Sequence, residues 1–225
     1  MWRSSIPSGT LALLCVVRAV VAGPANISLE RPANDPPLAA SPALRRLVDG
    51  ERFRVTDPGK LSATFWLRSR LAPRGEAPSE GSPVLAERIA IRGIPAAAFV
   101  GLASFDGAWL DYRGRIVKAG LYTMRYLVQP AIKDHKGVSA WRDFLILTPA
   151  AIDTEVDVDP RDLIARSATA AGSGHPFVMA LFPLPDPADL PGIFVNSLGQ
   201  PMVGARVGSH AMGIVLDGHG RIDEL

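Results

Sequence analysis

The chain has 225 residues, of which 48% are hydrophobic and 20% charged, which argues against a disordered or fibrous protein. The chain has 24 Lys and Arg residues and 22 Asp and Glu residues. Residues 1–22 contain Arg3 and Arg18 and no acidic residue, so the remaining chain has 22 basic and 22 acidic residues and no net charge. Such a balance argues against nucleic acid as a partner, because proteins that bind it usually carry a basic surplus.

Residues 1–22 have the pattern of a secretory signal peptide. Arg3 provides a positive charge, an apolar stretch follows, and Val20 and Ala22 occupy positions −3 and −1 of a cleavage site before Gly23. The apolar stretch is shorter than the ~20 residues that a membrane-spanning helix needs. The sequence therefore predicts a periplasmic or secreted protein, with no transmembrane span after signal cleavage.

The single cysteine, Cys15, lies in this predicted signal, so the mature chain is expected to form no disulfide and to offer no thiolate to a metal. The next segment, residues 23–42, is rich in Pro and Ala and predicts an extended leader. We expect residues 43–225 to form a single domain, in which the Pro-, Gly- and Ser-rich stretch 73–83 is a long exposed loop.

Alternation of apolar and polar residues predicts β-strands over much of this domain. In residues 61–68 every second residue is apolar; these are Leu61, Ala63, Phe65 and Leu67. In residues 121–128, Tyr122 and Tyr126 fall on one face of the predicted strand and Arg125 on the other. Shorter apolar runs predict further strands at residues 84–91, 97–102, 144–147, 177–182, 193–195 and 212–216.

These many short strands, and the 20 prolines and 21 glycines spread over the chain, predict a mainly β fold, an antiparallel β-sandwich or jelly roll. One short helix is expected at residues 160–171. Asp159 is suited to the N-cap, Pro160 to the first helical position, and Gly172 to the end of the helix.

The most unusual stretch of the sequence is residues 129–138, which join two of the predicted strands and are closed by residues 141–143. We expect a hairpin loop about ten residues long, and loops of this kind on rigid sheets often hold binding groups. His175 is expected to open another strand, 175–182, and could approach the same end of a sandwich. The candidate binding residues are Asp134, His135, Trp141, Arg142 and His175.

Two interpretations of these residues remain open. His135, His175 and a carboxylate are the minimum for a facial metal site, so they could serve a metal-dependent hydrolase. No HExxH or HxH spacing exists, however, and nothing in the sequence brings the two histidines together. Alternatively, Asp134 caps a turn through its own backbone, and Arg142 and Asp143 form an ion pair on an edge strand.

Two other groups of residues allow a functional and a structural interpretation. Acidic residues occupy every second position from 153 to 159; these are Asp153, Glu155, Asp157 and Asp159. They could bind calcium together, or they could form a solvated acidic loop before the helix. Aromatic residues could form a platform for sugars, or they pack in the core; these are Trp66, Trp109, Tyr112, Tyr126 and Trp141.

Three phrases of the sequence support a resemblance: VKAGLYTMRY at 117–126, DHKGV at 134–138 and RDFL at 142–145. Together they resemble a group of uncharacterised secreted bacterial proteins that share the phrase AGxYTxRY…DHxGV…RDFLLL. The resemblance covers about residues 105–150, with His175 and Pro176 in addition. It implies a secreted bacterial β-sandwich, and it implies no known activity, cofactor or catalytic residue.

We therefore expect an exported binding or interaction module, with the 129–143 loop and the start of the 175–182 strand as its contact surface. Asp134, Arg142 and His175 would be its polar anchors and Trp141 an apolar one. The expected partner is a protein or glycan of the cell envelope, and no cofactor or catalytic residue is predicted. The alternatives are the metal-dependent hydrolase using His135 and His175 and a purely structural envelope protein.

Overall fold

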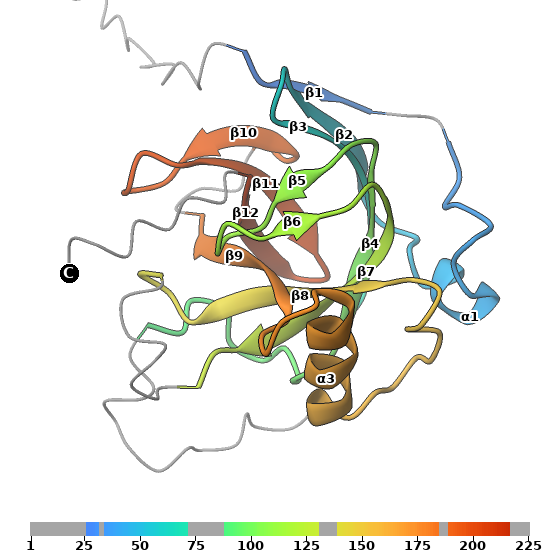
Figure 1. Ribbon diagram of the computed structural model, residues 1–225. Helices are drawn as coiled ribbons and strands as arrows, with labels where there is room; N and C mark the ends of the chain where they lie inside the picture. The colour runs from blue at the N-terminus through green and yellow to red at the C-terminus, as the bar shows by residue number, and fades with distance from the viewer. Residues whose placement is uncertain (1–25, 32–33, 72–87, 131–138, 185–188, 217–225) are drawn as a thin grey trace, which may run out of the picture.

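A computed structural model describes residues 26–31, 34–71, 88–130, 139–184 and 189–216. In these residues ten strands form one antiparallel sheet, in the order β1-β2-β3-β4-β7-β8-β9-β12-β11-β10, and β5 and β6 form a separate hairpin (Figure 1). In chain order the elements are β1 (Ser28–Glu30), α1 (Pro42–Arg45), β2 (Arg52–Asp57), β3 (Leu61–Leu67), β4 (Phe99–Phe105), β5 (Trp109–Leu110), β6 (Ile116–Val117), β7 (Gly120–Val128), β8 (Asp143–Pro149), α3 (Pro160–Ala170), β9 (Phe177–Pro183), β10 (Gly192–Val195), β11 (Pro201–Val207) and β12 (His210–Val215).

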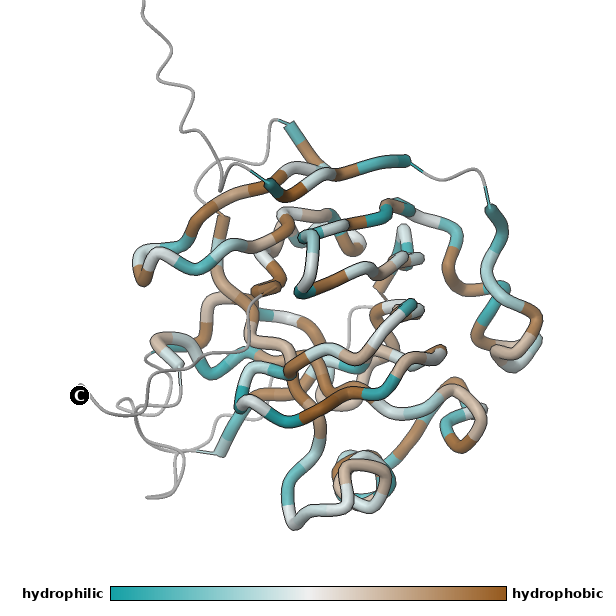
Figure 2. The backbone as a smooth tube through the Cα atoms, turned by 45° about the horizontal axis from the view of Figure 1, so that its top comes forward, coloured by the Kyte–Doolittle hydropathy of each residue, from teal (hydrophilic) through white to brown (hydrophobic). Residues whose placement is uncertain are grey.

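The sheet curves so strongly that its two halves face each other across one apolar core. Side chains from β2 and β3, such as Phe53 and Phe65, belong to the same buried cluster as Val203 of β11 and Ile214 of β12. Alternation along each strand places these groups on the inner face. Figure 2 shows the same pattern as hydrophobic residues that recur along the strands.

The two halves of the sheet meet where the β11–β12 turn approaches the ends of β2 and β3. The Arg206 amide donates to Glu51 Oε2 at 3.0 Å, and the Gly208 amide lies 3.4 Å from the Arg68 carbonyl oxygen. Gly208 has a φ of +59°, and a Cβ there would lie 3.1 Å from the Leu71 amide nitrogen. Glycine therefore suits both the backbone angle and the close approach at this point.

The β5–β6 hairpin closes one end of the curved sheet, which we call the hairpin end. Trp109 stacks on Phe105 with ring centroids 5.2 Å apart, and its indole N–H donates to the Leu216 carbonyl at 3.0 Å. Beyond the hairpin tip, the Tyr112 amide donates to the Val178 carbonyl of β9. Figure 1 shows the hairpin between the β4–β7 side of the sheet and the β11–β12 side.

The outer face of β3 and β4 is covered by the segment that precedes β2. The Trp66 indole donates to the Asn34 carbonyl at 3.1 Å, and Ser41 Oγ, which caps α1, donates to the Thr154 carbonyl at 2.8 Å. Ala40 and Leu44 are buried against Trp66. The described part of the predicted 23–42 leader therefore packs on the sheet, and β1 pairs with β2. The prediction of an extended leader missed these contacts because they are made largely by backbone carbonyls and small side chains.

The predicted helix is confirmed as α3, which covers the outer face of β8. The Asp159 side chain accepts from the Arg161 amide, Pro160 opens the helix, and Gly172 follows it with a φ of +61°. Ser167 Oγ donates to the Leu147 carbonyl at 2.5 Å and so joins the helix to the sheet. The second described helix, α1, was not predicted, because four residues are too few to show helical periodicity.

The prediction of a mainly β, antiparallel fold is confirmed. Seven predicted strands match β3, β4, β7, β8, β9, β10 and β12, whereas β1, β2, β5, β6 and β11 were not predicted. Residues 88–91, the described part of the predicted strand 84–91, form no strand. Ten of the described strands join in one curved sheet, and a division into the two facing sheets of a sandwich stays a prediction. No helix in the described ranges is long and apolar enough to cross a membrane.

Candidate functional site

Residues 88–97 lie at the end of the sheet opposite the hairpin, and we call them the lid segment. Ile91 and Ile94 are buried in the main core, where they cover the ends of the strands. Arg88 and Arg92 of the same segment are exposed. Gly93 has a φ of +87°, which glycine adopts readily, and so allows the chain to turn between the exposed Arg92 and the buried Ile94.

A buried carboxylate anchors the lid segment. Asp143, the first residue of β8, is fully buried and accepts hydrogen bonds from the Ala90 amide at 2.7 Å and the Ile91 amide at 3.2 Å. The Tyr126 hydroxyl donates to the same carboxylate at 2.6 Å and lies 2.9 Å from the Ile91 carbonyl oxygen. Asp143 and Tyr126 therefore hold the lid segment to β7 and β8 through three hydrogen-bond contacts, and a fourth joins the two side chains to each other.

The surroundings of Asp143 and Tyr126 raise the pKa of both side chains. Burial raises the pKa of Asp143, although the hydrogen bonds from Tyr126, Ala90 and Ile91 favour the carboxylate and lower it. Burial also raises the pKa of Tyr126, and the neighbouring charge of Asp143 adds to that shift. The Tyr126 hydroxyl is consequently a stable donor, and Asp143 is a carboxylate with no cation among these hydrogen-bond donors.

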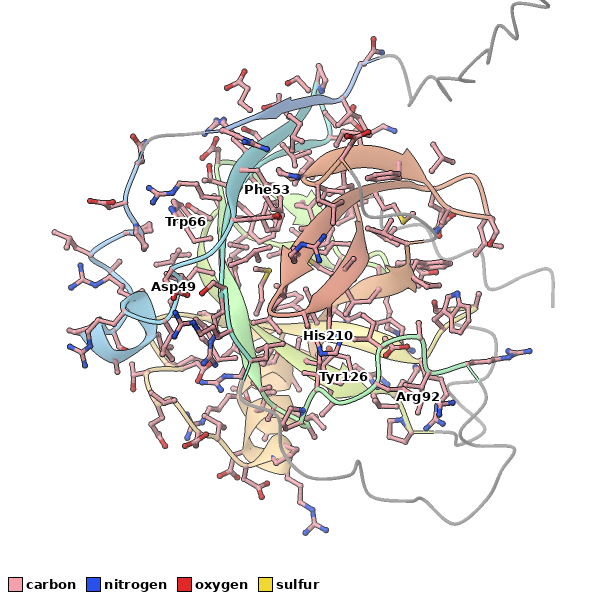
Figure 3. The ribbon with its side chains drawn as sticks, turned by 180° about the vertical axis from the view of Figure 1, so that it is seen from behind. Asp49, Phe53, Trp66, Arg92, Tyr126 and His210 are labelled. Atoms are coloured by element: carbon pink, nitrogen blue, oxygen red, sulfur yellow. The ribbon has the colours of Figure 1, made fainter. Side chains whose placement is uncertain are left out.

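Three further residues lie beside the lid segment. The Arg142 amide donates to the Arg88 carbonyl at 2.8 Å, and Trp141, which is partly exposed, precedes it. His210, at the start of β12, approaches Gly93, where a Cβ would lie 4.0 Å from its imidazole Cε1. Figure 3 shows Arg92, Tyr126 and His210 in the same part of the molecule. The lid surface, as used below, consists of Arg88, Arg92, Trp141, Arg142 and His210.

The lid surface is rich in positive charge. The described segments that form it are residues 88–97, 126–130, 139–143 and 207–212. They contain three arginines and one histidine, and within them Asp143 is the one acid, its carboxylate buried beneath the lid segment. Arg88 and Arg92 therefore present their guanidinium groups outward, whereas the Arg142 guanidinium is partly buried and its Nε donates to the Gln129 carbonyl. Two outward arginines above an inward carboxylate form an arrangement suited to binding anions.

The structure assigns the five predicted site residues to different places. Trp141 and Arg142 belong to the lid surface, whereas Asp134 and His135 lie outside the described residues. His175 is exposed and lies at the hairpin end, where its carbonyl accepts from Arg115 at 2.5 Å.

The two predicted histidines belong to segments attached at different ends of the sheet. The described strand ends that flank residues 131–138 are Val128 and Asp143, which pair with each other at the lid end. His175 instead precedes Phe177, which pairs with Leu147 near the other end of β8. Sheet topology therefore does not by itself bring His175 to the loop that contains His135. No group of three or more His, Cys, Asp or Glu in the described ranges could hold a metal ion.

The predicted ion pair between Arg142 and Asp143 on an edge strand is wrong. β8 lies between β7 and β9 and is therefore not an edge strand. The Asp143 side chain points inward, where it accepts a hydrogen bond from the Tyr126 hydroxyl. The Arg142 Nε instead donates to the Gln129 carbonyl at 2.8 Å. Neighbouring residues of a strand point to opposite faces, which separates the two side chains.

The predicted acidic group is also not a calcium site. Asp153 is fully buried and forms an ion pair with Arg125, whose Nε lies 2.7 Å from Asp153 Oδ2. Arg125 also donates to the carbonyls of Ala97, Glu155 and Val156. Glu155, Asp157 and Asp159 remain exposed. This buried pair fixes the loop before α3, and the sequence did not predict it.

The aromatic platform for sugars is likewise not formed. Four of its five residues are buried, as expected for core packing; these are Trp66, Trp109, Tyr112 and Tyr126. Trp141 is the exception, since it packs on the outer apolar cluster and remains partly exposed.

Comparison with protein-family models, curated proteins and solved structures finds no match for this chain.

Proposed function

We propose that the protein is an exported binding module and that the lid surface is where its partner binds. The observation that carries the proposal is the Asp143–Tyr126 anchor, which holds the backbone of the segment that carries the exposed Arg88 and Arg92, with Arg88 beside Arg142. A surface whose backbone is held in place before binding loses less conformational entropy when a partner binds. Arginine is also enriched among the residues that dominate binding energies.

Export and an envelope location belong to the same proposal and are supported by the pattern of residues 1–22. The resemblance to secreted bacterial proteins supports the location as well. In the predicted mature chain the positive and negative charges balance, so the positive lid surface reflects the local arrangement of charge and not a surplus over the whole molecule.

Photo-crosslinking in cells tests this proposal. A photoreactive phenylalanine analogue is placed at Ala96, an exposed lid residue, or at Lys118, an exposed residue of the hairpin end. We expect a discrete adduct from position 96 and none from position 118. The adduct should disappear when Arg88→Glu and Arg92→Glu are added. No adduct at position 96, equal adducts at both positions, or an adduct that survives the charge reversal would overturn the proposal.

A further inference from the structure

The lid surface combines cationic groups with one partly exposed indole. Arg88 and Arg92 are exposed, and Arg142 is fixed beside Arg88 by the backbone hydrogen bond to its carbonyl. A guanidinium group binds a carboxylate through two parallel N–H···O contacts, a geometry that lysine does not provide. The surface therefore favours ligands that carry carboxylates over neutral ligands.

Trp141 adds an apolar contact at the same place. It packs on the outer apolar cluster, which contains Phe144 and Ile146, and it remains partly exposed to solvent. An indole that is supported from behind loses little conformational freedom when a flat or apolar group stacks on it. The C–H face of a pyranose ring is such a group, whereas an acidic peptide side chain offers only its short aliphatic stem.

From these two features we infer that the ligand of the lid surface is an acidic polysaccharide whose sugar units carry carboxylates, that is, a polyuronate. The carboxylates bind Arg88 and Arg92, and a sugar ring stacks on Trp141. This inference rests on the proposed function, because it names the partner of the same surface. At this site one partly exposed tryptophan provides the contact with the sugar, in place of the five-residue aromatic platform that the structure does not form.

Binding of the purified full chain to polygalacturonate tests the inference, with polyglutamate as an acidic chain without sugar rings and dextran as a neutral polysaccharide. We expect saturable, salt-sensitive binding to polygalacturonate, weaker binding to polyglutamate and none to dextran. Arg88→Glu with Arg92→Glu should weaken polygalacturonate binding by about tenfold, because two exposed contacts between an arginine and a carboxylate are reversed to repulsion.

Two variants make the experiment specific. Arg46→Glu with Arg161→Glu changes the net charge equally at exposed positions outside the lid surface, and it should leave the affinity within about twofold. Trp141→Ala should weaken polygalacturonate binding while leaving polyglutamate binding unchanged, which an effect on charge alone would not do. The melting temperature of each variant identifies any that fails to fold, and Trp141→Phe then serves in place of Trp141→Ala.

The outcomes separate this inference from the proposed function. Absence of polygalacturonate binding, equal binding to polyglutamate, or an equal loss in the Arg46/Arg161 control overturns the polyuronate inference. If the Ala96 crosslink in cells persists with its dependence on Arg88 and Arg92, the binding module stands and its ligand is of another class. If the crosslink is also absent, the proposed function fails as well.

Discussion

Asp143 and Asp153 are both fully buried carboxylates, yet they are held by different kinds of partner. Asp153 lies against the guanidinium of Arg125 and also accepts from Thr123 Oγ1 at 2.5 Å. The hydrogen bonds to Asp143 come from a tyrosine hydroxyl and two backbone amides, all of them neutral. One site is an ion pair on the outer face of the sheet, and the other is a buried anion at the lid end.

The difference shows what each carboxylate does for the molecule. Arg125 and Asp153 compensate each other's charge, and Arg125 fixes the loop before α3 through carbonyls of Glu155 and Val156. Among the described residues no cation donates a hydrogen bond to Asp143, and burial disfavours its charged form. Its hydrogen bonds hold the lid segment, on which Arg88 and Arg92 are exposed. We therefore regard Asp153 as a structural group and Asp143 as the support of the lid surface.

The largest effect is expected when the ion pair is broken. Asp153→Asn leaves Arg125 fully buried without a counter-charge, which should lower the free energy of unfolding by about 3–5 kcal/mol. Chemical denaturation measures this change. The matched control Asp157→Asn removes an exposed carboxylate of the same loop and should change stability by no more than about 0.5 kcal/mol. Equal effects of the two variants would show that the buried ion pair is not a major source of stability.

The next largest effect is expected at Asp143. Asp143→Asn places an amide group where the Ala90 and Ile91 amides donate, so one buried donor loses its acceptor and stability should fall by about 1–3 kcal/mol. Hydrogen exchange should accelerate at Ala90 and Ile91. The exchange of residues near Trp109 at the hairpin end should change only as much as global stability does. Uniform acceleration throughout the chain would contradict a local anchor.

The difference in stability between the wild type and Asp143→Asn is expected to depend on pH. Because burial raises the pKa of Asp143 in the folded state, its contribution to stability is fully present below the unfolded value of about 3.9 and declines as pH rises through the folded value. The stability of the wild type relative to Asp143→Asn should therefore decrease from about pH 4 upward. Paired denaturation curves at several pH values measure this difference. An increase with pH would mean that hydrogen bonding outweighs burial at Asp143.

The smallest effect is expected from the loss of a single hydroxyl. Tyr126→Phe removes one donor to Asp143, which should lower stability by about 1 kcal/mol. It should also raise the pKa of Asp143 further, because the Tyr126 hydrogen bond favours the carboxylate. Tyr122→Phe is a matched control, since its hydroxyl donates to the Lys118 carbonyl at the hairpin end. Faster exchange at Ala90 and Ile91 is expected for Tyr126→Phe alone.

Local patterns were sufficient to predict the β class, most of the strands and α3. Asp159, Pro160 and Gly172 specify α3 within fourteen consecutive residues, and alternation in residues 121–128 correctly separated Tyr126 from Arg125. Arg125 was correctly assigned to the opposite face, but that face is buried. Its partner Asp153 is 28 residues away, and no local pattern links the two.

The candidate surface was predictable only in part, for the same reason. Trp141 and Arg142 stood out because they close an unusual loop between two clear strands. Arg88 lies 54 positions before Arg142 and is brought to it by a backbone hydrogen bond that any residue could form. The run 84–91 was predicted to be a strand because it is apolar, and in its described part Ile91 is indeed buried in the core. The Ala90 and Ile91 amides bind the Asp143 side chain instead of a neighbouring strand.

The most direct test of the account combines the anchor with binding. The Ala96 crosslink is measured in cells that carry either native Asp143 or Asp143→Asn, with Arg88 and Arg92 intact in both. The account predicts that the adduct is lost or strongly reduced in Asp143→Asn, at equal protein level, because the lid segment no longer holds the arginines in place. An undiminished adduct would contradict the claim that Asp143 supports the binding surface.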